Sequence, residues 1–321
     1  MLVYTLRRIV TMIPIIFLVS VVVFFLAHLM PGDALTGRID PLNANPEYIA
    51  EMRGKLGLND PIYQQYLRWI GGFLQGDFGQ SFVHKMPVSG LILSRLPNTI
   101  LLAVIAMFIT YIVAFLMGKY AGRRPNTTGD YGVQIINYLA LAMPSFVAAL
   151  LLIYFVSFQL GWLPATGSIG SGVAPGSWGY IVSKVQHAIL PSLCLGLLPI
   201  ASYTQFLRND MIESAQKDYV RTARAKGTSE RRIYNKHILR NSVIPIVTLL
   251  GFDLAGIIGG SVIIESIFTY PGVGQLFVDS INNRDYTVVM AITMLLTVMT
   301  LLGNLIADIL YALVDPRIRL D

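Results

Sequence analysis

The chain has little charge and almost no cysteine, and both shortages narrow what it can be. Charged residues make up 13% of its 321 residues and hydrophobic residues 54%, whereas a soluble globular protein carries about 25% charged residues. The single cysteine, Cys194, excludes a disulfide within the chain and a structural zinc site built from cysteines. The four histidines are far apart in the sequence and lack ligand spacing, so we expect no metal site.

The chain also lacks the motifs of nucleotide hydrolysis. Gly-Lys occurs at Gly54-Lys55 and Gly118-Lys119, but without the upstream glycine and the following Ser or Thr of a phosphate-binding loop. Neither Gly-x-Ser-x-Gly nor His-Glu-x-x-His is present. The net charge of +6 does not indicate a nucleic-acid partner, because the basic residues have no stacking aromatics between them. We therefore predict that the chain is not an enzyme and binds no cofactor of its own.

Long apolar runs replace the missing charge. Crossing roughly 30 Å of hydrocarbon takes about 20 helical residues. Six apolar stretches are each long enough to cross: 9–30, 99–121, 134–158, 188–207, 242–265 and 288–314. The first stretch has a longer apolar core than a signal peptide, and no small-x-small cleavage site follows it, so we expect it to be retained. The sequence thus predicts an all-α integral membrane protein with six transmembrane helices.

The distribution of Lys and Arg orients these helices. With the N-terminus inside, the inner segments contain 16 basic residues, nine of them from Arg208 to Arg240, whereas the two short outer loops contain only Lys184 and Arg284. The third outer loop, at about 31–98, is long enough to cross regardless of charge. We therefore expect a multi-pass protein of the cytoplasmic (inner) membrane, in contact with lipid, whose N- and C-termini are both cytoplasmic.

These spans divide the chain into four parts. Residues 1–30 form an N-terminal transmembrane helix, 31–97 an extracytoplasmic loop module, 98–315 a domain of five helices with a basic inner loop at 208–241, and 316–321 a cytoplasmic tail. The aromatic side chains of the outer loop indicate a small module of short helices packed on the outer mouth. A connector with no role of its own is the alternative.

The capping residues of the basic inner loop predict two helices. Asp218 is a good N-cap and Gly227 a good C′ residue, because glycine adopts the left-handed conformation at little cost. The segment between them predicts a two-turn helix. Thr228 or Ser229 can cap a second helix that ends near Arg240.

The first of these helices suits a docking role. Ala223 and Ala225 give it a face of small residues that can seat closely in a groove of another protein. Arg221, Arg224 and Lys226 can pair with acidic residues there. The alternative is a basic loop that sets topology and touches lipid headgroups.

At residues 218–227 the sequence reads Asp-Tyr-Val-Arg-Thr-Ala-Arg-Ala-Lys-Gly. It resembles the cytoplasmic EAA loop of ABC importer permeases, with Arg221-Thr222-Ala223 at the acidic-small-small triplet, Gly227 at the glycine and Ile244-Pro245 at the Ile/Leu-Pro that follows. Arginine in place of glutamate, and the longer gap to the proline, are similar to the dipeptide, oligopeptide and nickel branch.

Further segments across essentially the whole chain resemble the same branch, and most of all the first of its two permeases. They are Tyr4-Thr-Leu-Arg-Arg-Ile9, Met30-Pro-Gly-Asp33, Gly76-Asp-Phe-Gly-Gln-Ser81, Leu96-Pro-Asn-Thr99, Glu265-Ser-Ile-Phe-Thr-Tyr-Pro-Gly-Val-Gly274, Arg284-Asp-Tyr286 and Asp308-Ile-Leu-Tyr-Ala-Leu-Val-Asp-Pro-Arg-Ile-Arg319.

The resemblance implies the type I ABC importer transmembrane fold and a permease subunit for di- or oligopeptides, with nickel, glutathione or another small solute as alternatives. Its implied partners are a second homologous permease, two cytoplasmic ATPase subunits that bind ATP and Mg, and an extracytoplasmic binding protein. The resemblance also implies a coupling helix of this chain that binds in a cleft of the ATPase. The residues of this coupling helix would be Asp218, Tyr219, Arg221, Thr222, Ala223, Arg224, Ala225, Lys226 and Gly227.

A protein of another class, a stand-alone secondary transporter or channel, is the rival hypothesis. Such carriers often have inverted repeats and interrupted helices near the membrane midplane. The sequence shows no repeat, and charges inside the predicted spans are few.

Polar and small residues inside the spans are candidates for a substrate path. A carboxylate at the bilayer centre costs about 2.5–3.5 kcal/mol, so Asp308 should line a path or form a structural anchor. Asp253 and Asn304 are further path candidates. Gly256 and Gly260 form a Gly-x-x-x-Gly pattern that allows close helix contact with a partner permease or within the chain.

Residues 270–273, Tyr-Pro-Gly-Val, predict a tight turn at the outer mouth, with proline second and glycine third.

Overall fold

The computed structural model describes residues 2–29, 50–51, 53–54, 57–243, 246 and 261–314, with side chains from residue 5 to residue 309 within those ranges. Regular structure there is helical, apart from one isolated bridge between Gln80 and Pro87. The elements are α1 (Leu2–Leu29), α3 (Ile62–Leu74), α4 (Val88–Arg123), α5 (Thr128–Ala142), α6 (Ser145–Leu152), the π-helix η1 (Ile153–Gln159), α7 (Trp178–Ser214), α8 (Asp218–Ala225), α9 (Glu230–Arg232), the π-helix η2 (Ile233–Ile238), α11 (Val273–Asn282) and α12 (Tyr286–Val314). Residues 261–267 form a further helical segment.

Four helices, α1, α4, α7 and α12, are long and apolar enough to cross a membrane. They contain four of the six predicted spans. Two of them start well before the predicted boundary: α4 begins at Val88 rather than at residue 99, and α7 at Trp178 rather than at residue 188. Ser177 caps α7 by accepting a hydrogen bond from the Tyr180 N–H at 3.1 Å, so this helix starts on a local signal outside the apolar run.

The span predicted over residues 134–158 is not one continuous helix. α5 and the α6–η1 segment meet at 109°, because Met143 is extended before Pro144, as the residue before a proline usually is. Counting this pair as one span brings the total in the described ranges to five. Most of the remaining predicted span, the fifth at residues 242–265, lies outside the described residues.

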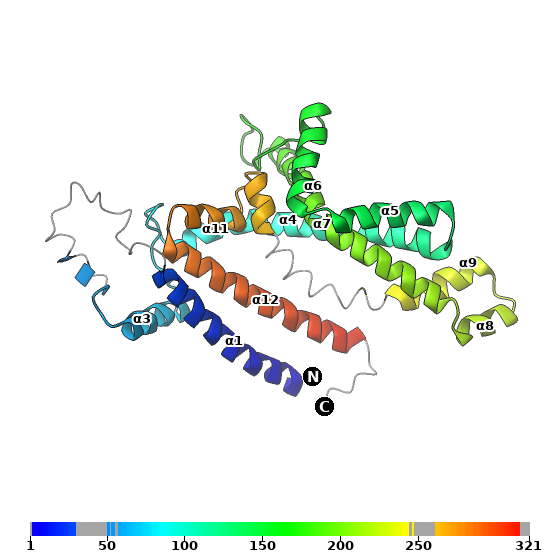
Figure 1. Ribbon diagram of the computed structural model, residues 1–321, viewed down its shortest axis with the longest axis horizontal. Coiled ribbons are helices and arrows are strands. Elements are labelled where there is room, and N and C mark those ends of the chain that lie inside the picture. Colours follow the sequence, from blue (N-terminus) through cyan, green and yellow to red (C-terminus); the bar gives the residue numbers. More distant parts are fainter. Residues whose placement is uncertain are drawn as a thin grey trace.

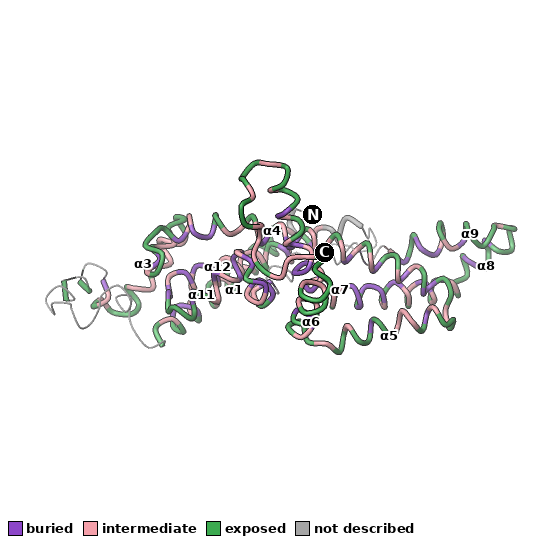
Figure 2. Tube along the Cα trace, turned by 90° about the horizontal axis from the view of Figure 1, so that it is seen from above, coloured by how far each residue is buried: buried purple, intermediate pink, exposed green. Residues whose placement is uncertain are grey.

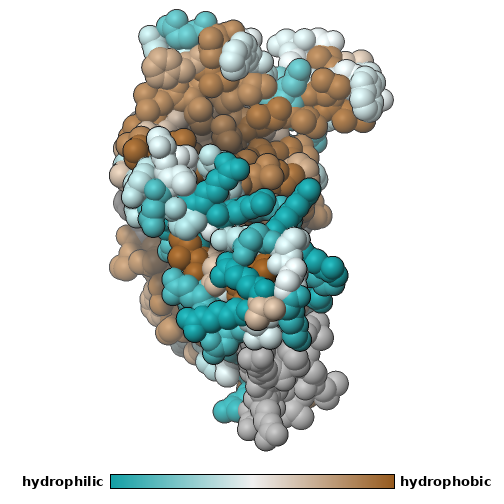
Figure 3. Space-filling view, turned by 90° about the vertical axis from the view of Figure 1, so that its right-hand side faces the viewer, coloured by the Kyte–Doolittle hydropathy of each residue, from teal (hydrophilic) through white to brown (hydrophobic). Residues whose placement is uncertain are grey.

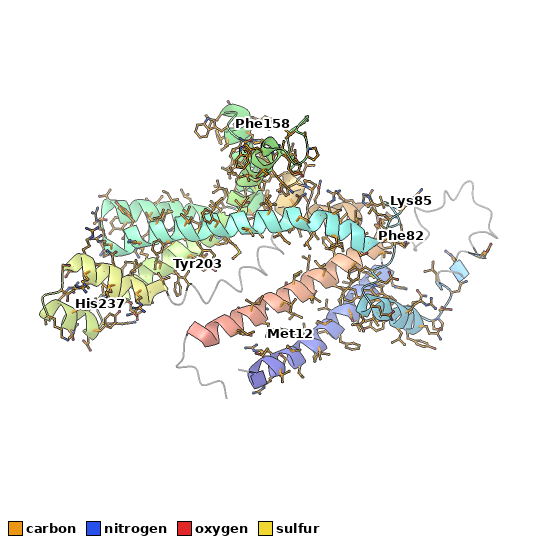
Figure 4. The ribbon with its side chains drawn as sticks, turned by 180° about the vertical axis from the view of Figure 1, so that it is seen from behind. Met12, Phe82, Lys85, Phe158, Tyr203 and His237 are labelled. Atoms are coloured by element: carbon orange, nitrogen blue, oxygen red, sulfur yellow. The ribbon has the colours of Figure 1, made fainter. Side chains whose placement is uncertain are left out.

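The helices form an elongated bundle with one projecting arm. α4, α5 and α7 extend side by side toward α8 and α9, α1 runs beside α12, and α6 projects away from the others (Figure 1). Figure 4 places Phe158 at the far end of this arm and Met12 on the α1 side of the α1–α12 pair. Seen from above, buried residues recur along α4 and α7, whereas α5 is mostly exposed (Figure 2).

Two glycines bring α4 and α7 into close contact. A Cβ added to Gly118 would lie 2.9 Å from the Leu207 Cβ, and one added to Gly122 would lie 2.9 Å from the Met211 Cβ. Small residues four positions apart allow helix backbones to approach in this way. Sequence analysis applied the pattern to Gly256 and Gly260, which lie outside the described residues, and missed it here.

The described part of the outer loop packs on α1 and α12. Phe24 of α1 lies against Tyr66 and Trp69 of α3, with ring centroids 5.4 and 5.7 Å apart. Between α3 and α4, Ser81 donates a hydrogen bond to Asp285, which directly precedes α12. Figure 4 shows Phe82 and Lys85 in this segment, beside the start of α12. This loop is therefore attached to both helices of the pair, at the end where α1 finishes and α12 begins.

Candidate functional site

The helix predicted between Asp218 and Gly227 is present as α8, and its C-terminal cap is confirmed. Gly227 has a φ of +76°. Its N–H donates to the Arg224 carbonyl at 2.9 Å, and the Thr228 N–H donates to the Ala223 carbonyl at 3.1 Å. These two bonds form a Schellman motif, which ends the helix sharply and satisfies two of its last carbonyls.

The predicted N-cap of α8 is wrong by one residue, whereas Ser229 takes the N-cap position predicted for the second helix. Lys217 takes the N-cap position of α8, and Asp218 is its first helical residue. The Asp218 carboxylate still lies in the first turn, where a negative charge favours the helix. Ser229 takes the N-cap position of α9 without a side-chain bond. Beyond α9 the predicted second helix continues as a π-helix, η2, before it returns to α-helix at residues 239–243.

One face of α8 packs inside its own chain. Val220 is fully buried and Ala223 is 8% exposed, and both belong to a cluster with Leu207 and Met211 of α7 and Ile233 of η2. Figure 4 shows Tyr203 on α7 and His237 on η2, on either side of this region. Because residues three apart share a helix face, Val220 and Ala223 attach α8 to the ends of α7 and η2.

The face of small residues expected for docking is therefore divided. Ala223 packs inward, whereas Ala225 is exposed. The remaining exposed residues of α8 include Tyr219 and Thr222. This end of the molecule carries mostly hydrophilic side chains, below the apolar surface of the projecting arm (Figure 3).

The charges of this segment are partly paired within the chain. Arg224 Nε lies 2.7 Å from Glu230 Oε1, and this hydrogen bond holds the pKa of Glu230 below its usual value. Arg221 lies 3.5 Å from Asp218, with its side chain 74% exposed. Arg224, one of the residues expected to pair with another protein, joins α8 to α9 within this chain.

A buried ion pair that sequence analysis missed clamps α5 to α7 close to this cluster. Arg208 Nε and Nη2 donate to the two carboxylate oxygens of Asp130 at 2.6 and 2.8 Å. The Asp130 side chain is fully buried and that of Arg208 is 12% exposed. The Asn126 N–H donates a further bond to Asp130 at 2.8 Å. In the sequence Arg208 counts only as a topology charge, and Asp130 is three residues after the Thr127 cap of α5.

A second buried carboxylate lies at the opposite end of α4. Glu265, in the helical segment 261–267, is fully buried. It accepts hydrogen bonds from the Thr99 hydroxyl of α4 at 2.8 Å and from the N–H groups of Gly274 and Gln275 at 2.7 and 3.1 Å. It therefore caps the N-terminus of α11 from a distance. Sequence analysis gave Glu265 no role of its own.

The chain turns at Pro271, but not through the four-residue turn predicted at residues 270–273. Gly272 has a φ of −107° and a ψ of −172° and is the N-cap residue of α11. Its N–H bonds to the Tyr270 carbonyl at 2.7 Å, whereas the Val273 N–H bonds to the Thr99 hydroxyl at 2.8 Å. A long-range partner thus takes the donor that a four-residue turn would have used.

Of the predicted path residues, the structure describes only Asn304 and Asp308, which are one turn apart on α12. Arg8 Nε lies 3.1 Å from Asp308 Oδ2, a contact that fits the structural-anchor interpretation of Asp308. Asn304 is partly buried, and Asp253, Gly256 and Gly260 lie outside the described residues. The part of the chain that the structure describes contains no group of three His, Cys, Asp or Glu side chains that could hold a metal ion. The path and the expectation of no metal site stay predictions.

Comparisons with known proteins agree with one another and cover nearly the whole length of this chain. The family model described as binding-protein-dependent transport system inner membrane component matches residues 112–320, and its N-terminal companion matches residues 1–103. The oligopeptide transport system permease protein AppB of Bacillus subtilis (strain 168) is 43% identical over 319 residues, covering 98% of this chain and 99% of that protein. The glutathione transport system permease protein GsiC of Escherichia coli (strain K12) is 39% identical over 319 residues, covering 99% of each.

A solved structure supports the fold. The inward-facing MetNI methionine ABC transporter matches with a TM-score of 0.55 at 16% identity, covering 70% of this chain and 96% of that chain.

Proposed function

This chain belongs to the family of binding-protein-dependent transport system inner membrane components, and on that premise we propose that it is the first permease subunit of an ATP-driven importer of di- or oligopeptides. The relatives named for oligopeptide and for glutathione support a peptide-like substrate. Nickel or another small solute is the alternative. The chain would work beside a second homologous permease and receive substrate from an extracytoplasmic binding protein.

The observation that carries this proposal is the two-faced helix α8. One face is held in the chain by Val220 and Ala223, and the other is exposed. We propose that the exposed face seats in a cleft of a separate cytoplasmic ATPase, two copies of which bind ATP and Mg. Moving a transporter from 1:99 to 99:1 between two states takes about 5.5 kcal/mol of differential binding. The Val220 contact offers a route by which that work reaches α7 and α4.

The same proposal assigns six spans, an outer insertion and cytoplasmic termini. The four long helices and the bent α5–α6 pair account for five spans. The sixth would be the apolar stretch at 242–265. The Arg8–Asp308 pair joins the first part of α1 to the last part of α12, which supports both termini on one side of the membrane.

Reconstitution tests the proposed function. The chain co-expressed with a second permease and an ATPase should hydrolyse ATP faster when a peptide-loaded binding protein is added, and should accumulate peptide in proteoliposomes. Peptide transport by the chain alone in liposomes, without ATP, would instead identify a stand-alone carrier.

Gly227→Val is expected to uncouple hydrolysis from uptake while the chain remains in the membrane. A Cβ at Gly227 would meet open space, so the cost comes from the left-handed backbone, roughly 1–2 kcal/mol for a residue other than glycine. This would loosen the cap that ends α8. The measurement is peptide uptake per ATP hydrolysed by the assembled complex.

Gly172→Val is the matched control for this cap. Gly172 has a φ of +80° and open space around it, but it lies in the loop before α7, away from α8. The control should keep the normal ratio of uptake to hydrolysis. Normal uptake by the Gly227 variant would count against a role for the capped helix.

A further inference from the structure

Glu265 joins three elements that are far apart in sequence. Its carboxylate takes hydrogen bonds from α4 through Thr99 and from the start of α11 through Gly274 and Gln275. The Ser261 hydroxyl, on the same helical segment, also bonds to it. Four donors therefore surround one fully buried acidic group, which is the arrangement that a buried charge requires.

The backbone around this group is shaped to admit the carboxylate. A Cβ on Gly272 would overlap the Glu265 carboxylate, and one on Gly274 would lie 2.5 Å from the Val262 Cα. The glycines of the Pro-Gly-Val-Gly stretch are thus needed for close approach, since neither has a positive φ. The N-terminus of α11, which carries partial positive charge, then faces the carboxylate.

Thr99 has two roles in the same network. Its hydroxyl donates to Glu265 and accepts from the Val273 N–H, both at 2.8 Å. The neighbouring Asn98 side chain donates to the Pro271 carbonyl at 2.8 Å. α4 therefore holds the segment 270–273 through two adjacent residues, and Glu265 holds it from the other side.

We propose that Glu265 is a positioning residue that fixes the segment 261–267, the start of α11 and α4 at Thr99 as one body during transport. This inference rests on the proposed function. The segment 261–267 ends the predicted fifth span, which follows directly after α8, α9 and η2 in the chain. Glu265 is thus in the span that the chain enters directly after the element proposed to contact the ATPase. Because separating any of the three elements would strip a buried carboxylate of its donors, they move together.

The test uses the complete transporter complex and separates coupling from assembly. Glu265→Gln keeps the size of the side chain but turns an acceptor into a donor toward the α11 N–H groups. Thr99→Val removes the hydroxyl, and Thr99→Ser keeps it. We expect E265Q and T99V to lower peptide uptake per ATP hydrolysed by about tenfold, and T99S to resemble the wild type. The controls S266A and D279N, a neighbouring hydroxyl and an exposed carboxylate of α11, should leave the ratio unchanged.

The distance between two spin labels tests whether the joined elements move as one body, which a purely structural role of Glu265 does not require. Labels at I263C and L93C, two exposed positions on the segment 261–267 and on α4, should keep one distance with and without trapped ATP. In E265Q the distance distribution should broaden.

A wild-type distance that changes between nucleotide states, or a normal uptake ratio in both E265Q and T99V, would overturn the proposal. If E265Q fails to assemble, T99V against T99S decides the question. A wild-type complex without peptide-stimulated ATP hydrolysis would instead sink the proposed function.

Discussion

Arg208→Ala is expected to lower the free energy of unfolding by about 3 kcal/mol, because it leaves the fully buried Asp130 carboxylate without its charged partner. The lower end of the range for broken buried pairs applies, since the pair is near the start of α5 and the end of α7. The loss should appear as a lower melting temperature in detergent and a lower yield of assembled complex.

Two further variants give this prediction its controls. Arg232→Ala removes an exposed arginine from α9 and should melt like the wild type. The double variant D130N with R208M removes both charges but keeps an oxygen that accepts from the Asn126 N–H. It should recover more than half of the lost stability, because no unpaired charge is left. Wild-type melting of R208A would mean that the pair is not buried in the membrane-embedded protein.

Val220→Asp is expected to detach α8 from the bundle and to reduce ATP-driven uptake by tenfold or more. Val220 is fully buried in an apolar cluster with Leu207, Met211 and Ile233, and a carboxylate there would have no partner in that cluster. Burying it would cost several kcal/mol, so the helix should leave its seat instead. ATPase binding would then no longer move α7.

Comparison of the two faces of α8 makes this prediction specific. Ala225→Asp places the same charge on the exposed face. It should leave the melting temperature of the isolated chain unchanged and still impair uptake by disturbing the ATPase contact. V220D should lower both. If A225D destabilised the isolated chain as much as V220D does, the division of α8 into an inner and an outer face would be wrong.

The parts of the site that sequence predicted correctly depend on neighbouring residues. Gly227 ends α8 through backbone bonds between residues at most five positions apart. The local sequence is therefore enough to predict this cap. The inward direction of Ala223 follows from its spacing of three residues from Val220 and not from its small size. The break at Pro144 was not predicted because the apolar run continues across it. Hydrophobicity alone does not show that a proline forces the preceding residue out of the helical conformation.

The buried carboxylates were missed for a different reason. Asp130 finds Arg208 on another helix, and Glu265 finds Thr99 on α4. No local pattern indicates such partners, because they meet only after the helices have packed. A charged residue inside an apolar chain does signal that a partner is needed. That argument was applied to Asp308, whose partner proved to be Arg8, and it applies equally to Glu265.

Thiol labelling of A225C in the assembled transporter tests the account most directly. The only native cysteine, Cys194, is buried, so the background should be low, and S94C at the far end of α4 provides an exposed control. Adding the ATPase should slow labelling of A225C by about tenfold or more, since the core of an interface excludes water, and leave S94C unaffected. Equally fast labelling of A225C in a complex that transports peptide would contradict the docking of α8.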